Sequence, residues 1–477
     1  MPFWHNEPWN GLSILSDSLM PYQLESLLQY YRCPERYARF GVLEPRLGPA
    51  GYFRVGQEVV YGKCLDRTET SPAGRSYDAL TNVSFDGNIP WLPFDPGEVV
   101  DNLRYERYTY GRHSGRLRFA IEKAYYSIRP LLHLALRKHL QKIYLNDWRQ
   151  LSFPRWPVDC TVDCLFATLL RLSMKAHGVD RIPFIWFWPD GASSCAMITH
   201  DVETATGKDF CSSLMDIDDS FGIKASFQVV PERRYPIPPG FLDSIRERGF
   251  EINIQDLNHD GRLFSSRKEF LTRAAIINGY SRRLGVTGFR SAILYRRQEW
   301  YDALEFSYDM SVPNVAHLDP QRGGCCTVMP YMNGRILELP VTTTQDYSLF
   351  HILNDYTIQL WTQQMEVIQE HNGLISFIVH PDYVRKARAT RAYEALLSKL
   401  TDLRSRNGLW IAKPAEVDKW WRERMQMRLV PDGQQFRIEG HGSDRARIAF
   451  AYENNGALAF SLEPRTSNIP EYVGPGL

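Results

Sequence analysis

CAMITHDVE, residues 195–203, is an apolar run that ends in two acidic residues. FEINI, residues 250–254, is followed within five residues by a glutamine and a histidine, and LISFIV, residues 374–379, is followed at once by a histidine. Each run has the length of a buried β-strand. Polar groups placed directly after several buried strands indicate a site, because such groups are costly to bury without partners.

The same pattern of an apolar run and then a helical stretch repeats through the middle of the chain. The seven runs are CAMIT (195–199), ASFQVV (225–230), FEINI (250–254), VTGF (286–289), FSYDM (306–310), LELPV (337–341) and LISFIV (374–379). Helical patterns lie between them, and Gly249, Gly285 and Gly373 stand where helices should stop. Alternating β and α units predict a parallel sheet or barrel, so we expect an α/β fold in which residues 190–425 form one (β/α) barrel.

The N-terminal part, residues 1–185, lacks this regular alternation. It opens with a predicted helix at 23–31 and closes with another at 159–177. A basic amphipathic stretch at 129–148 fits either an anionic lipid surface or a solvated helix face, and the solvated face is the preferred interpretation. The sequence assigns no role to this part.

The C-terminal part, residues 427–477, alternates with period two in QQFRIEG, ARIAFAYEN and GALAFSLEP. The dipeptides Asp-Gly at 432–433 and Asn-Gly at 455–456 are turn signals between such strands. The pattern predicts a small antiparallel β appendage. A packing cap on the barrel is the preferred role for it, and sugar binding is the alternative.

Composition restricts the partners and the compartment. The chain has 477 residues, of which 44% are apolar, so a globular protein of two or three domains is expected. Its 56 basic and 55 acidic residues give no electrostatic reason to expect nucleic acid. Eight cysteines without a CxxC pattern favour reduced thiols. Neither a signal peptide nor an apolar run of about 18 residues is evident, so we expect a cytoplasmic protein without a transmembrane segment.

Chemically active side chains gather at the ends of five of the seven runs. They are Asp201, Glu203, Gln255, His259, Arg290, Asp309 and His380. In a parallel barrel the C-terminal ends of the strands converge on one mouth, so these side chains should meet in space. A lone histidine after a strand is more often structural than catalytic, but the set as a whole favours a functional site over coincidence.

Five short motifs resemble those of a known family in their order and spacing. THDVE (199–203), NHDG (258–261), GFRS (288–291), SYDMSVPN (307–314) and SFIVHPDY (376–383) look like the motifs of polysaccharide deacetylases, carbohydrate esterase family four. The resemblance covers roughly half of the chain. It implies metal-assisted hydrolysis of an N-acetyl group on an amino sugar of a polysaccharide or its precursor, and hence a carbohydrate as partner.

The resemblance also implies roles for individual residues. Asp201 stands at the position of the catalytic base, and Arg290 resembles the arginine that holds this base. His380 stands at the position of the acid that protonates the leaving amine, and Asp309 is expected to orient it. A carboxylate and an imidazole on opposite sides of a carbonyl carbon can serve as base and acid in amide hydrolysis.

Three further residues stand at the family's metal positions. Glu203 matches a carboxylate ligand, and His259 and Gln255 match a pair of histidines, so a divalent metal, expected to be zinc, is implied. An amide oxygen is a weak, neutral ligand for zinc, and the neighbouring Asp256 should point to the other face of its strand. We therefore expect Gln255→His to raise zinc affinity if this side chain faces the metal.

Two further departures and two alternative functions follow from the same residues. Ser291 follows Arg290 where the family has a proline, and Glu203 is one methylene longer than the family's aspartate.

One alternative function is a catalytically inactive carbohydrate-binding or scaffolding protein with the same fold. The other is a metal-free hydrolase of carbon–nitrogen bonds, similar to the cofactor-independent allantoinases.

Overall fold

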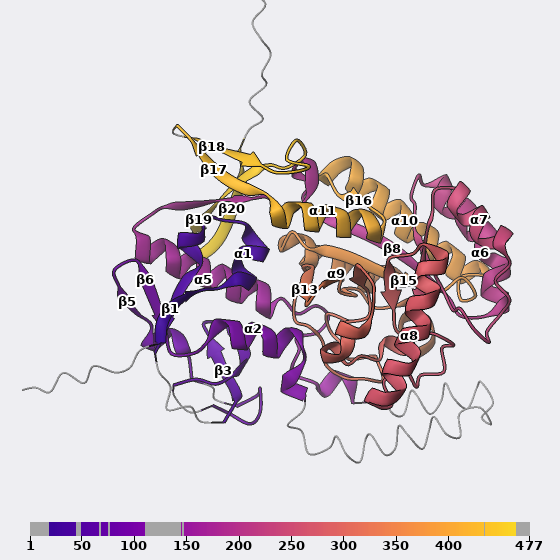
Figure 1. Ribbon diagram of the computed structural model, residues 1–477, viewed down its shortest axis with the longest axis horizontal. Helices are drawn as coiled ribbons and strands as arrows, with labels where there is room; N and C mark the ends of the chain where they lie inside the picture. Colours follow the sequence, from indigo (N-terminus) through magenta and orange to yellow (C-terminus); the bar gives the residue numbers. More distant parts are fainter. Residues whose placement is uncertain are drawn as a thin grey trace, which may run out of the picture.

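The computed structural model describes residues 19–43, 49–65, 68–74, 77–109, 145, 147–433 and 435–463. Two groups of elements lie side by side in it, an N-terminal group and a curled sheet surrounded by helices (Figure 1). Most of the basic stretch at 129–148 falls outside the described residues, so its expected solvated face stays a prediction. Among the helices that the structure describes, none has the length and apolar character needed to cross a membrane.

Seven parallel strands form the curled sheet, and they coincide with the seven apolar runs. In sheet order they are β14 (Ile336–Glu338), β12 (Tyr308–Asp309), β11 (Gly288–Arg290), β10 (Glu251–Gln255), β9 (Ser226–Val229), β8 (Cys195–Val202) and β15 (Leu374–Val379). Almost every residue in them is buried, which explains why they read as continuous apolar runs. The predicted (β/α) barrel is confirmed, in an open form.

Two short strands extend this sheet. β13 (Tyr331–Asn333) pairs antiparallel with β14 and forms one edge. β16 (Trp410–Ile411) runs parallel to the beginning of β8, on the side where β9 pairs farther along. The barrel therefore contains one antiparallel edge strand beside otherwise parallel neighbours.

Threonine side chains connect the two edges of the open barrel. After β14 the chain runs alongside β15, where the Thr342 hydroxyl donates to the Leu374 carbonyl over 2.7 Å and accepts from the Ser376 amide over 2.9 Å. The Thr343 hydroxyl donates to the Ser376 carbonyl over 2.7 Å. These bonds stand in place of a backbone ladder, and Asp346, three residues after Thr343, lies at the end of β15, where it accepts from the His380 amide.

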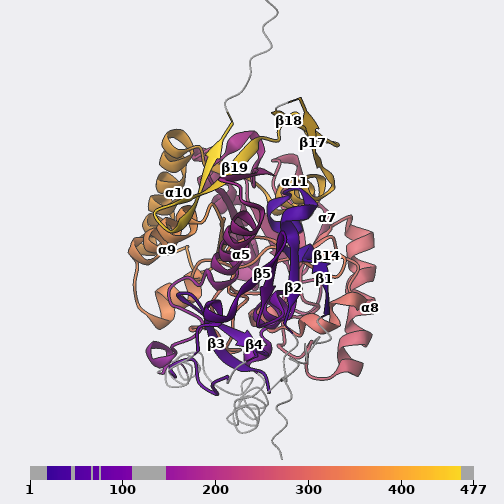
Figure 2. The ribbon, with the colours of Figure 1, turned by 90° about the vertical axis from the view of Figure 1, so that its left-hand side faces the viewer.

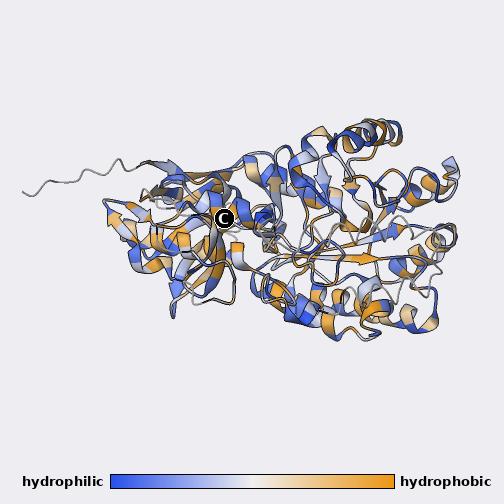
Figure 3. Cartoon of the chain, turned by 90° about the horizontal axis from the view of Figure 1, so that it is seen from below, coloured by the Kyte–Doolittle hydropathy of each residue, from blue (hydrophilic) through white to orange (hydrophobic). Residues whose placement is uncertain are grey.

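Six helices that carry both hydrophobic and hydrophilic residues lie around the barrel (Figure 3). They are α6 (Ala205–Ser220), α7 (Pro239–Glu247), α8 (Arg267–Leu284), α9 (Gln359–Glu370), α10 (Ala387–Asn407) and α11 (Pro414–Gln426). The first five pack apolar residues into the core of the barrel, and the sixth packs its apolar residues into the core shared with the N-terminal group. The Ser266 side chain caps α8 by accepting from the Glu269 amide, and Gly285 ends that helix with φ 62°.

The expected stop at Gly373 is wrong, because Asn372 takes the left-handed position after α9, with φ 55°. Glycine is needed at position 373 for a different reason, because a neighbouring side chain leaves no room for a Cβ. A Cβ there would come within 2.6 Å of the Val328 side chain. Asparagine tolerates positive φ better than most residues, which is why the sequence placed the stop one residue late.

The described residues of the N-terminal group form small sheets and three α-helices. Its sheet strands are β1 (Leu19–Gln23), β2 (Arg39–Val42), β6 (Ile89–Leu92) and β5 (Ser84–Asp86), next to a hairpin of β3 (Gly51–Val55) and β4 (Glu58–Gly62). The helices are α1 (Glu25–Tyr31), α2 (Pro96–Arg104) and α5 (Thr161–His177). Both helices expected from the sequence, at 23–31 and 159–177, are present, and Gly178 ends α5 with φ 61°.

The C-terminal strands are antiparallel, as the sequence predicts. β17 (Arg428–Asp432) pairs with β18 (Gln435–Glu439), and β19 (Ile448–Asn454) pairs with β20 (Ala457–Leu462). β19 also pairs antiparallel with β7 (Arg181–Ile185). β19 and β20 therefore complete a three-stranded sheet with β7 of the N-terminal group, next to α5 in Figures 1 and 2, whereas β17 and β18 form a separate hairpin.

The N-terminal group shares its apolar core with α11 and β19. It also meets the barrel through a buried ion pair, in which Arg296 Nε donates to Glu106 Oε2 over 2.6 Å. On the other side, Arg424 of α11 donates to the Tyr30 and Ile185 carbonyls. The domain boundaries at 185–190 and 425–427 stay predictions, and one apolar core has residues on both sides of each.

Candidate active site

The C-terminal ends of four strands bring the predicted side chains together. Asp201 lies in β8, Gln255 ends β10, Arg290 ends β11, and His380 follows β15. The residue before Asp201 lies opposite the residue before His380 in the pairing of β8 with β15. The two side chains therefore emerge at the same edge of the barrel.

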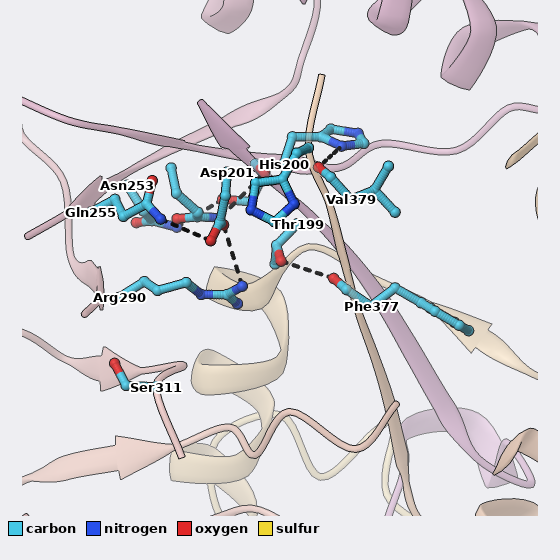
Figure 4. Close-up of polar contacts among 12 residues, drawn as sticks. Thr199, His200, Asp201, Asn253, Gln255, Arg290, Ser311, Phe377 and Val379 are labelled. Atoms are coloured by element: carbon cyan, nitrogen blue, oxygen red, sulfur yellow. Dashed lines mark hydrogen bonds and ion pairs between the residues drawn. The ribbon is translucent and has the colours of Figure 1, made fainter. Parts of the chain in front are cut away.

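The Asp201 carboxylate is 4% exposed and has two donors (Figure 4). Arg290 Nη1 lies 3.3 Å from Oδ1, and Gln255 Nε2 donates to Oδ2 over 2.9 Å. Burial raises the pKa of Asp201, although Arg290 and His380 oppose the rise. A carboxylate with a raised pKa accepts a proton more readily than a solvated one, which suits a general base.

His380 is held by a carboxylate that the sequence reasoning missed. Its Nδ1 lies 2.6 Å from Asp346 Oδ1, and its backbone amide donates to Asp346 Oδ2 over 2.7 Å. Burial alone would lower the pKa of His380, but Asp346 and Glu203 raise it well above its ordinary value. With Nδ1–H fixed on Asp346, Nε2 is the nitrogen that faces the site, as a general acid requires.

Asp309 does not orient His380, contrary to the expectation from the sequence. Its carboxylate accepts from the Ser311 amide over 3.0 Å and from the Ser311 hydroxyl over 2.7 Å, and it lies in register with Glu338 of β14. Burial, and then the neighbouring Asp309 carboxyl, raise the pKa of Glu338. The chain that follows β14 runs beside β15, and Asp346 in that segment is the carboxylate that reaches His380.

Glu203 lies between both histidines of the site. Its Oε1 is 2.7 Å from His259 Nε2 and 3.4 Å from His380 Nε2, and Gln255 Nε2 donates to it over 3.3 Å. Burial alone would raise the pKa of Glu203, but His259 and His380 hold it well below its ordinary value. Glu203 is therefore an ionised acceptor surrounded by donors.

His259 follows β10 in a loop with φ 54° and is 3% exposed. Its Nε2 lies close to Glu203, at an angle outside that of an aligned hydrogen bond. At the other side of the ring, Arg234 Nη2 donates to Nδ1 over 2.8 Å and to the His259 carbonyl over 2.8 Å. The partner of Nδ1 is thus an arginine, whereas the usual partner for a metal-binding histidine is a carboxylate or carbonyl.

Asp201, Glu203 and His380 each offer a ligand atom within 4.8 Å of the others, a spacing that could hold a metal ion. The set assigned to zinc from the sequence, with Glu203, His259 and Gln255, fits less well. The Gln255 amide nitrogen donates to both carboxylates while its oxygen is buried without a partner. The reverse orientation would set that oxygen against two carboxylates. A hydrogen-bond donor, Gln255 Nε2, thus occupies a position expected of a ligand, so this second set does not fit a metal centre, whereas the spacing of the first set does.

A buried pair on the other face of β8 supports the strand ends that carry Asp201 and His380. His200 Nδ1 lies 3.1 Å from the carbonyl of Val379, which precedes His380 (Figure 4). His200 Nε2 lies 2.9 Å from Asp218 Oδ2. The Tyr393 hydroxyl donates to Asp218 Oδ1 over 2.6 Å. These contacts fix the alignment of β8 with β15 where Asp201 and His380 emerge.

Sequence reasoning missed Asp346, Arg234 and the pair of His200 with Asp218. A signal existed for Asp346, since an acidic residue lies shortly after the sixth apolar run, in TTTQD. His200 is part of the motif THDVE, but neighbouring residues of a strand point to opposite faces, so its place beside Asp201 does not indicate a role. Arg234 lies in the loop PERRYP, which carries no pattern that distinguishes it from a solvated turn.

Comparison with known proteins gives structural neighbours only. No protein-family model and no curated protein matches the chain. Among solved structures, the Puue allantoinase is 11% identical over 49% of this chain and 92% of its own, with a TM-score of 0.39. The peptidoglycan deacetylase PdaC from Bacillus subtilis is 14% identical over 48% of this chain and 93% of its own, with a TM-score of 0.31.

A mutant of a pseudoenzyme of carbohydrate esterase family four, with restored enzymatic activity, also matches. It is 15% identical over 47% of this chain and 67% of its own, with a TM-score of 0.32. The solved structures that the chain matches thus include members of the family that its motifs resemble. At these identities and TM-scores, its function has to be inferred from its own site.

Proposed function

We propose that the chain hydrolyses the carbon–nitrogen bond of an N-acetyl group on an amino sugar, with Asp201 as base and His380 as acid. The observation that carries this proposal is that Asp201 and His380 lie at one edge of the barrel and that each is held by a different charged residue. Arg290 holds Asp201, and Asp346 holds His380. The amino sugar is proposed from the motifs that resemble polysaccharide deacetylases, and a cytoplasmic precursor is the proposed form of the substrate.

The reaction needs two proton transfers. Asp201 takes a proton from a water molecule as the water oxygen bonds to the carbonyl carbon. His380 Nε2 then gives a proton to the nitrogen as the carbon–nitrogen bond breaks, which yields acetate and a free amine. Proton exchange between the two residues and solvent restores the starting state. No step uses the predicted zinc, because the Gln255 amide donates to both carboxylates and so does not fit the ligand set assigned to zinc.

The test is acetate release from N-acetylglucosamine oligomers by the full chain, with and without a chelator. Activity in chelator should persist, and Asp201→Asn and His380→Gln should each lose at least about 100-fold in kcat, the usual contribution of a general base or acid. Matched controls are Asp209→Asn and His441→Gln, whose side chains are 72% and 82% exposed. Complete loss in chelator would restore the metal-assisted mechanism, and an inert wild type would favour the carbohydrate-binding alternative.

A further inference from the structure

We infer that Arg234 closes the predicted metal position by fixing His259 in the tautomer whose proton sits on Nε2. A histidine can bind a metal through Nε2 only when this nitrogen has a free lone pair. The inference concerns metal binding, so it does not depend on whether the chain is an active hydrolase.

The first support comes from Nδ1. A guanidinium group has donors only and stays charged at every physiological pH, so the nitrogen that accepts from Arg234 Nη2 carries no proton. A neutral imidazole with an unprotonated Nδ1 must carry its proton on Nε2. The second bond of Arg234 Nη2, to the His259 carbonyl, holds the guanidinium in place although the residue as a whole is exposed.

The second support comes from the groups that face Nε2. Glu203 Oε1 lies 2.7 Å away, and an ionised carboxylate beside a ring nitrogen favours a proton on that nitrogen. The pair of Arg234 and Glu203 therefore polarises the ring in one direction, with a donor at Nδ1 and an acceptor at Nε2. In a metal-binding histidine this direction is reversed, with an acceptor at Nδ1 and the metal at Nε2.

The consequence concerns position 255. The sequence led to the expectation that Gln255→His alone would raise zinc affinity. With His259 fixed as a donor, that change supplies only one new ligand and leaves the second closed. We therefore expect Gln255→His to bind zinc weakly until Arg234 is also replaced.

The experiment is a zinc titration of the full chain and four variants. These are Gln255→His, Arg234→Met, the double variant Gln255→His/Arg234→Met, and the control double variant Gln255→His/Arg233→Met. Arg233 is the exposed neighbour, and among the described residues its side chain makes no hydrogen bond to His259. The control double variant therefore corrects for the loss of one positive charge near the site. Zinc affinity of the first double variant should exceed that of the control by at least about tenfold, a difference of 1.4 kcal/mol.

A second measurement uses the wild type and avoids any effect of substitution on folding. Two-dimensional 15N–1H spectra of the imidazole, assigned with His259→Gln, distinguish the two neutral tautomers directly. A protonated Nε2 and an unprotonated Nδ1 are expected. A proton on Nδ1, or equal zinc affinity of the two double variants, would overturn the inference.

Discussion

His380 and His259 both place Nε2 against the same oxygen of Glu203, at 3.4 and 2.7 Å, but opposite groups hold their other nitrogen. Asp346, an acceptor, lies at Nδ1 of His380, and Arg234, a donor, lies at Nδ1 of His259. The acceptor lets His380 keep two protons, one of which it can give away. The donor occupies the lone pair of Nδ1 in His259 and leaves Nε2 as the nitrogen that can carry a proton. The group at the far nitrogen thus decides what each histidine can do.

The two partners also differ in burial. Asp346 is completely buried and binds both the ring and the backbone of His380, whereas Arg234 is exposed and reaches His259 with the end of its side chain. A buried charged contact is costly to break, while solvent and salt weaken one at the surface. Changes at Asp346 should therefore have larger effects than changes at Arg234.

The largest expected effect is on catalysis, from Asp346→Asn. An amide stabilises an imidazolium less than a carboxylate does, and its NH₂ group can force the wrong tautomer on His380. We expect kcat for acetate release to fall by at least about 100-fold, with a smaller change in KM. Arg234→Met, assayed in parallel, should keep kcat within about tenfold. Retention of more than a tenth of the activity by Asp346→Asn would remove the distinction between the two histidines.

An intermediate effect is expected on the pH dependence of stability. The pKa of His380 is raised in the folded chain, so the folded state binds this proton more tightly than the unfolded state does. The resulting stabilisation is complete below the unfolded pKa of about 6.5 and is lost as the pH rises through the folded value. Urea unfolding of the wild type should show this loss above about pH 6.5. The slope should be smaller in His380→Gln, and an unchanged slope in that variant would assign the loss to another group.

The smallest expected effect is on stability, from Arg234→Met. The contact is at the surface, so the free energy of unfolding should change by no more than about 1 kcal/mol. Thermal unfolding at low and high salt measures this change, with Arg233→Met as the control. A loss of several kcal/mol would mean that Arg234 is part of the folded core of its loop, and its role would then extend beyond the tautomer of His259.

The barrel strands could be predicted because parallel strands covered on both faces leave continuous apolar runs, and all seven runs became strands. How the two edges of the open barrel, near β14 and β15, meet could not be predicted. The chain after β14 continues beside β15 through side-chain bonds of Thr342 and Thr343, and three threonines in a row look like a loop. Asp346 was missed for the same reason, since its place beside His380 depends on that extended segment.

Arg234, the partner of His259, could not be predicted from the sequence for a different reason. Motif spacing indicates which residues end a strand, but the group that binds the far side of a ring comes from another loop. Arg234 reaches His259 from the loop after β9, at a distance that no local pattern encodes. The pairing of β7 with β19 was hidden in the same way, because its register is set between segments far apart in the chain.

That last pairing has a consequence for synthesis of the protein. Ile185 of β7 pairs with Ile448 of β19, and the Ile185 carbonyl also accepts from Arg424. A ribosome adds about 5–20 residues per second, so β7 leaves it on the order of tens of seconds before its partner strand exists. Throughout that interval β7 offers an unpaired edge with apolar residues such as Phe184, the kind of edge to which other chains can add. We expect the N-terminal group to complete its fold only after nearly the whole chain has been made, and a nascent chain stopped before β19 to depend on chaperones.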